Sequence, residues 1–159
     1  VNIDIKPGSD PNSINPFGRG LIPVAILGSE VFDVSAIDVT TLRFGPAQVA
    51  TRHDLTDDWD YNEHLADVNF DGFMDLVTHF TTQDTGIACG DIEAVLSGAL
   101  LDGTPFEGTD AVRTVGCNSN RPSRGFTLRG FERMQERQSR LNSEDQSRPS
   151  DLVEDQRAD

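Results

Sequence analysis

The middle of the chain carries oxygen-bearing side chains at the spacing of a calcium-binding loop. The pattern is Asp67-x-Asn69-x-Asp71-Gly72-x-x-Asp75. Ca²⁺ takes six to eight oxygen ligands, and a short loop with carboxylate or amide side chains at alternate positions can wrap around it. Glycine at the sixth position permits the sharp turn that such a loop needs. The predicted ligands are the side chains of Asp67, Asn69, Asp71 and Asp75 and the backbone carbonyl of Phe73.

The flanks of this loop predict strands and not helices. An EF-hand loop has a bidentate Glu at its twelfth position, where this chain has Thr78. Residues 76–81 are β-branched and aromatic, which favours a strand. The stretch resembles the strand–loop–strand calcium sites of FG-GAP repeats in integrin-like propellers, but only one copy is present. The resemblance therefore implies the site and not a propeller fold. A polar turn without a metal is the alternative, since Asp, Asn and Gly also fill turns.

A second acidic group lies just before the loop. Asp58, Asp60 and Glu63 could complete the calcium sphere, hold a second ion, or be carboxylates of an ordinary loop. Trp59 and Tyr61, the only residues of their types, share this segment. Their rings could stack on sugars, or they could form a lid over the core. The predicted cofactor is thus Ca²⁺, and polysaccharide contact is an alternative use of the segment.

The two cysteines of the chain, Cys89 and Cys117, predict one disulfide in an extracellular protein. Two buried free thiols are the alternative. A zinc site is not expected, because the chain has no C-x-x-C pair and its histidines have no ligand spacing to the cysteines. The histidines are His53, His64 and His79, and His79 is expected to be a partly buried strand residue.

Composition argues against several function classes. The formal net charge of −14 disfavours nucleic acid, whose phosphates require a basic face. The acidic excess is concentrated in residues 1–127, where 19 Asp and Glu face 7 Lys and Arg for a net charge of −12. Mean hydropathy is −0.41, and no apolar run approaches the roughly 18 residues of a membrane span. No G-x-S-x-G, H-E-x-x-H or P-loop signature is present, so the protein is not expected to be an enzyme.

The elements that must position the loop are predicted to be strands. Residues 1–6, 20–28, 37–44 and 76–81 alternate apolar and polar residues or are continuously apolar. Residues 92–98 favour a strand, with a short helix as the alternative. Residues 111–115 are expected to close the sheet. Residues 1–127 are therefore predicted to form one all-β domain, an antiparallel β-sandwich of jelly-roll or immunoglobulin-like type, with the calcium loop between strands.

Several local signals refine this expectation. Pro23 should mark an edge strand or a bulge, because it cannot donate to a β-ladder. The alternation slips near Thr40, which predicts a β-bulge. Asp102-Gly103 predicts a hairpin turn, and residues 105–110 predict another turn.

Five motifs together resemble a module repeated in large secreted or surface proteins of bacteria. They are V-N-I-D-I-K-P-G-S, I-P-V-A-I-L-G-S, T-L-R-F-G-P, D-V-N-x-D-G-x-x-D-L-V and D-G-T-P-F-E-G-T-D-A-V-R-T-V, within residues 1–116. The resemblance implies an extracellular accessory domain with a β-sandwich-like fold, often one of several in a longer protein. It implies no particular activity.

Residues 128–159 are almost wholly polar and predict a C-terminal tail that is extended or partly helical. Such a tail could be ordered by a neighbouring subunit, and an extended segment that joins a neighbour's sheet would build a fibre. The sequence therefore predicts a secreted or cell-surface, non-catalytic, calcium-binding structural or adhesion module. Its partners would be further copies of itself or other extracellular proteins. The alternative is a carbohydrate-binding accessory module of a secreted enzyme.

Overall fold

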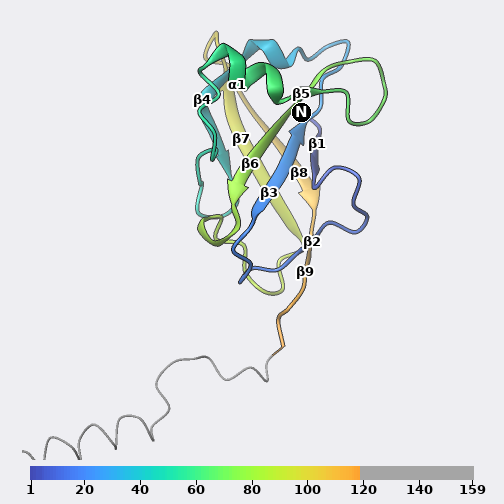
Figure 1. Ribbon diagram of the computed structural model, residues 1–159, viewed down its shortest axis with the longest axis vertical. Helices are drawn as coiled ribbons and strands as arrows, with labels where there is room; N and C mark the ends of the chain where they lie inside the picture. Colours follow the sequence, from blue (N-terminus) through green and yellow to red (C-terminus); the bar gives the residue numbers. More distant parts are fainter. Residues whose placement is uncertain (119–159) are drawn as a thin grey trace, which may run out of the picture. The chain divides into compact units, whose positions relative to one another are not determined.

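A computed structural model describes residues 1–118, which form an all-β unit whose two larger sheets are antiparallel (Figure 1). The compact part is Val1–Cys117. Residues 119–127 of the predicted domain and the predicted tail at 128–159 lie outside the described residues. The strands are β1 (Ile3–Ile5), β2 (Ser13–Ile14), β3 (Leu21–Ile26), β4 (Ile37–Phe44), β5 (Leu65–Ala66), β6 (Asp75–Thr81), β7 (Glu93–Leu100), β8 (Pro105–Ala111) and β9 (Arg113–Thr114). The helical elements are η1 (Val34–Ala36), α1 (Asp58–Glu63) and η2 (Thr82–Asp84).

The first sheet carries the candidate loop, which joins its last two strands. Its strand order is β1-β3-β6-β5, and all pairs are antiparallel. In β6, Leu76, Thr78 and Phe80 are fully buried, whereas Val77 and His79 on the opposite face are half-buried. This alternation confirms the predicted strand and the partly buried position expected of His79, because successive side chains of a strand point to opposite sides.

The position of Pro23 differs from the prediction of an edge or bulge. Pro23 lies in β3, an inner strand, and is paired with His79 of β6. On the other side its carbonyl accepts a hydrogen bond from the Lys6 amide at 2.7 Å, just beyond the end of β1. The N–H and C=O of one residue point to the same side in an antiparallel ladder. The missing donor of Pro23 therefore faces the end of β1, where no further ladder bond is required.

The second sheet has the order β4-β7-β8 and is also antiparallel. Its register shifts between Asp38 and Arg43, which confirms the predicted bulge. The β7–β8 connection is the predicted hairpin turn, with Gly103 at a φ of +87° and its amide bonded to the Leu100 carbonyl at 2.8 Å. Residues 92–98 fall largely in β7, which confirms the predicted strand against the helix alternative.

The predicted turn over residues 105–110 is wrong, because this segment is the edge strand β8. Pro105 is the first residue of β8, a position where proline is tolerated in a sheet. Gly108 has a packing role and not a turn role. A Cβ at Gly108 would lie 2.6 Å from Ile3 and 2.9 Å from the Val1 carbonyl oxygen, so the glycine admits the N-terminal strand.

The hydrophobic core lies between the two sheets, and Figure 1 shows β3 and β6 in one layer and β7 and β8 in the other. The rings of Phe44 in β4 and Phe80 in β6 lie 4.9 Å apart across this core. The sheets meet along β1 and β8, where the Ile5 amide donates to Asp110 Oδ2 at 2.8 Å. Of residues 111–115, which were expected to close the sheet, Ala111 ends β8 and pairs with Glu93 of β7. Arg113 and Thr114 instead form β9, which pairs in parallel with β2.

Two further features bear on the sequence predictions. Cys89 and Cys117 form the predicted disulfide, with 5.8 Å between their Cα atoms. The irregular segment before the loop contains the short helix α1, which was not predicted. Asp57 caps α1 by accepting the Trp59 amide at 2.9 Å, and an Asp at this position is a helix-start signal that the sequence contained. Among the described residues, no helix is long and apolar enough to span a membrane.

Candidate metal centre

The loop between β5 and β6 turns its polar side chains inward onto its own backbone. The Asp71 amide donates to Asp67 Oδ1 at 3.1 Å and to Asn69 Oδ1 at 3.2 Å. The second oxygen of Asp67 accepts the Gly72 amide at 2.9 Å. Two of the predicted ligand side chains therefore bring oxygens to the same amide group. Gly72 has a φ of +91°, the left-handed conformation predicted for it.

Asp71 is the most accessible of the predicted acidic ligands. Its side chain is exposed, Oδ1 accepts the Phe73 amide at 2.9 Å, and Oδ2 accepts the Asn69 side-chain amide at 2.9 Å. Asp67 is half-buried and Asn69 is exposed. The loop thus gathers carboxylate and amide oxygens, the ligand type that Ca²⁺ prefers.

Asp75 is different, because its carboxylate is fully buried and connects the loop to the sheet. Oδ1 accepts the Gly28 amide at 2.9 Å, and Oδ2 accepts the Val68 amide at 2.8 Å. A Cβ at Gly28 would lie 2.2 Å from the Met74 carbonyl oxygen, so a glycine is required for this close approach. Each carboxylate oxygen can accept more than one contact, so these bonds leave capacity for an ion. Asp75 therefore clamps both ends of the loop.

The second acidic group lies on α1. Asp58 and Glu63 are exposed and Asp60 is half-buried. Asp58 and Asp60 stand in the first turn, where negative charge interacts favourably with the helix dipole. This placement accounts for two of the three carboxylates without a metal. The second ion stays a prediction.

The two aromatic residues of α1 do not form a common platform. The Trp59 side chain is 73% exposed. Tyr61 is half-buried against the core, and its hydroxyl donates to the Val34 carbonyl at 3.1 Å. Burial, followed by the charge of Asp33, raises the pKa of Tyr61 above its usual value. Tyr61 therefore fits the alternative of a lid over the core, and Trp59 is the one aromatic side chain of this segment that is left exposed for contact with a sugar.

All three histidines of the chain lie together in one cluster, where the sequence had predicted no zinc site. The ligand nitrogens of His53, His64 and His79 lie within 4.8 Å of one another. In residues 1–118 this is the one such group of three or more His, Cys, Asp or Glu side chains. Burial, and then the nearby His64 and His53, lower the pKa of His79 below its usual value. Spacing to the cysteines could not reveal this cluster, because the fold brings the histidines together from separate segments.

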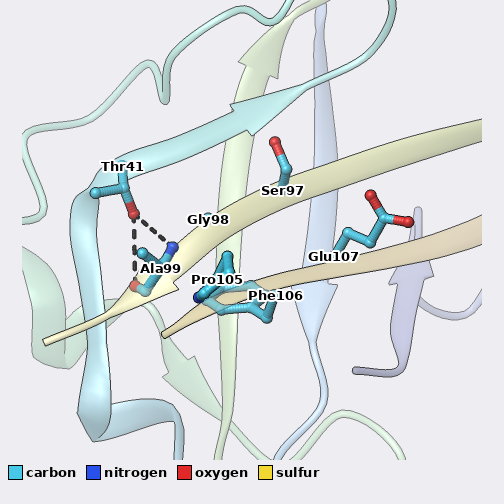
Figure 2. Close-up of a pocket in the computed structure, with 7 residues that line it drawn as sticks. All are labelled: Thr41, Ser97, Gly98, Ala99, Pro105, Phe106 and Glu107. Atoms are coloured by element: carbon cyan, nitrogen blue, oxygen red, sulfur yellow. Dashed lines mark hydrogen bonds between the residues drawn. The ribbon is translucent and has the colours of Figure 1, made fainter. Parts of the chain in front are cut away.

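A shallow hollow on the second sheet offers no comparable set of reactive groups (Figure 2). The two side-chain hydroxyls in the hollow already form hydrogen bonds within the fold. Thr41 Oγ1 donates to the Asp38 carbonyl at 2.7 Å and accepts the Ala99 amide at 2.8 Å, and Ser97 Oγ donates to Gln48 Oε1 at 3.2 Å. The residues lining the hollow are Thr41, Ser97, Gly98, Ala99, Pro105, Phe106 and Glu107.

Fold and site define a disulfide-bonded all-β unit with an oxygen-rich loop and a histidine cluster. Comparisons of the chain with models of known protein families, with curated proteins and with solved structures find no match. The function of the protein must therefore be inferred from the chemistry of these residues.

Proposed function

We propose that residues 1–118 form a non-catalytic, calcium-stabilised structural module of a secreted or cell-surface protein, with its two sheets arranged as a sandwich. The observation that carries this proposal is the inward-turned loop. Asp67 and Asn69 direct oxygens to the Asp71 amide, and buried Asp75 clamps the loop to Gly28. Oxygen-rich loops of this kind suit a hard cation.

Calcium would act mainly on stability. Three carboxylates occupy nine consecutive residues of this loop, and a bound cation would offset their mutual repulsion. The loop runs directly into β6, an inner strand of the four-stranded sheet. An ion that binds only the folded loop would therefore stabilise the sheet by mass action.

The proposed location and role have separate supports. A disulfide between Cys89 and Cys117 suits an oxidising compartment such as the exterior of a cell. Both hydroxyls in the hollow of Figure 2 are engaged in the scaffold, which favours a structural over a catalytic role. Adhesion and self-association into fibres through the tail remain hypotheses, as does the carbohydrate-binding alternative, for which exposed Trp59 is the available contact.

The test is thermal and urea unfolding with added Ca²⁺ and with chelator, on the parent chain and on Asp71→Asn. Asp102→Asn is a matched control, because Asp102 is also exposed and also accepts the amide two residues ahead, at 2.8 Å. At a hundredfold excess over Kd, Ca²⁺ should stabilise the parent and the control by about 2.7 kcal/mol. Asp71→Asn should lose most of this gain. A parent that gains nothing from Ca²⁺, or an Asp71→Asn variant that gains as much as the parent, would contradict the proposal.

A further inference from the structure

Three separate segments bring the histidines of the chain together. His53 lies in the connection after β4, His64 is the C-cap of α1, and His79 is in β6. The ring centroids of His53 and His64 are 4.9 Å apart, and each lies 5.4 Å from that of His79. Because the chain has only three histidines, this arrangement uses every imidazole available.

Backbone hydrogen bonds to β6 hold the segments that carry the other two rings. The Arg52 amide, next to His53, donates to the His79 carbonyl at 2.8 Å. The Val77 amide donates to the His64 carbonyl, also at 2.8 Å. The cluster is therefore positioned by the sheet and does not depend on contacts between flexible side-chain ends.

The hydrogen bonding of the rings leaves nitrogens free to bind a metal. His64 Nδ1 lies 2.7 Å from the Val77 carbonyl oxygen. A carbonyl only accepts, so Nδ1 is the donor of this bond, and in the neutral tautomer that makes it, Nε2 of His64 presents a lone pair. Metal-binding histidines commonly donate their other ring N–H to a backbone carbonyl in this way.

His79 supplies an independent sign of a missing partner. Its Nδ1 is buried and has no hydrogen-bond partner among the described residues. Buried polar atoms without a partner are rare, since the lost contact with water is not replaced. A metal ion bound at Nδ1 would remove the cost of burying this nitrogen without a partner. An ion bound at Nε2 would do so if the ring turned to bring Nδ1 to a hydrogen-bond acceptor.

We propose that His53, His64 and His79 form a binding site for a borderline divalent transition metal, with Zn²⁺ as the reference ion. Three neutral imidazoles are a recurrent Zn²⁺ ligand set that leaves the fourth tetrahedral position to water or another ligand. Ligands at 2.0–2.1 Å from the ion would stand about 3.3 Å apart, so the nitrogens must approach by up to about 1.5 Å. His53 is exposed, and rotation of its ring can supply much of this movement.

This site is chemically distinct from the calcium loop. The loop offers carboxylate and amide oxygens from Asp67, Asn69 and Asp71, which suit Ca²⁺, whereas imidazole nitrogens suit Zn²⁺, Cu²⁺ and Ni²⁺. The two sites lie on the same strand, because Asp75 begins β6 and His79 follows four residues later. Each site can nevertheless be removed without changing a ligand of the other.

The experiment is isothermal titration of the full chain, without a histidine tag, with ZnCl₂ in the presence of Ca²⁺. His53→Gln is the main variant, because this exposed residue can be replaced without opening the core. We expect one Zn²⁺ per parent chain. In His53→Gln the affinity for Zn²⁺ should fall at least about tenfold, because losing even an outer-shell partner of a metal ligand costs about that much. His79→Gln should lose affinity similarly. Changes in the ¹⁵N shifts of the imidazoles, with His64 Nε2 among the affected nitrogens, should accompany binding.

Asp71→Asn and His53→Gln together distinguish the two sites. Asp71→Asn should keep the Zn²⁺ titration of the parent and lose the Ca²⁺ stabilisation, and His53→Gln should do the reverse. Absence of Zn²⁺ binding to the parent would overturn the histidine site, as would unchanged affinity in folded His53→Gln, which would assign the zinc to surface carboxylates. Neither result would affect the calcium proposal.

Discussion

Replacing Asp75 by alanine should destabilise the domain even when calcium is absent. The fully buried carboxylate accepts the amides of Gly28 and Val68, and alanine would leave both donors without a partner. Hydrogen bonds to a charged group contribute about 1.5–3 kcal/mol each, so two of them amount to about 3–6 kcal/mol. Removing a buried charge returns part of this through relieved desolvation. We therefore expect a net loss of about 2–4 kcal/mol in the free energy of unfolding.

The assay is urea unfolding in chelator at pH 7 with the disulfide intact, analysed by linear extrapolation. Asp71→Ala is the matched control within the same loop, and because Asp71 is exposed it should cost about 1 kcal/mol or less in chelator. Asp75→Asn keeps one acceptor oxygen and should fall between the parent and Asp75→Ala, which covers the case in which the alanine variant does not fold. An Asp75→Ala variant within about 0.5 kcal/mol of the parent would refute the clamp.

Two further predictions concern the disulfide and the response to pH. Reducing the Cys89–Cys117 disulfide, whose cysteines are 28 residues apart, should lower the free energy of unfolding by about 3–4 kcal/mol in the chain-entropy model. The control is a Cys89→Ser/Cys117→Ser double variant, whose free energy of unfolding should not change when reductant is added. Burial, and then the charges of Asp110 and Asp75, raise the pKa of Asp4 above 3.8, so its ionised form destabilises the fold at neutral pH. Asp4→Asn should therefore be more stable than the parent at pH 7. This difference in stability should decrease as the pH falls through the raised pKa of Asp4 and be absent below 3.8. A difference that stays constant with pH would contradict this cause.

Local patterns were sufficient where a strand or turn depends mainly on its own residues. The β-branched and aromatic residues at 76–81 predicted β6. Asp102-Gly103 predicted the β7–β8 turn, because the left-handed conformation of Gly103 is a property of the turn itself. The two cysteines predicted their own pairing because no other partner existed.

The wrong assignments share a physical cause, which is that neighbours override local preference. Residues 105–110 contain turn-forming residues but form β8, because pairing with β7 and close approach of Ile3 to Gly108 decide the conformation. Proline is tolerated at position 23 of the inner strand β3 because β1 ends beside it, so that no hydrogen-bond donor is needed there. In contrast, α1 has a local start signal in its cap residue Asp57, and this signal is already present in the sequence.

By itself, the sequence determined the oxygen-rich loop, because its ligand types follow one another within nine residues and need only a turn to face inward. Only the tertiary structure decided the burial of Asp75, whose partner Gly28 lies 47 residues earlier. The histidine cluster likewise depends on the fold. His53, His64 and His79 share no motif, and they meet because Arg52 and His64 are hydrogen-bonded to β6. Such a site arises from strand pairing between distant segments, and the spacing of its residues along the chain does not predict it.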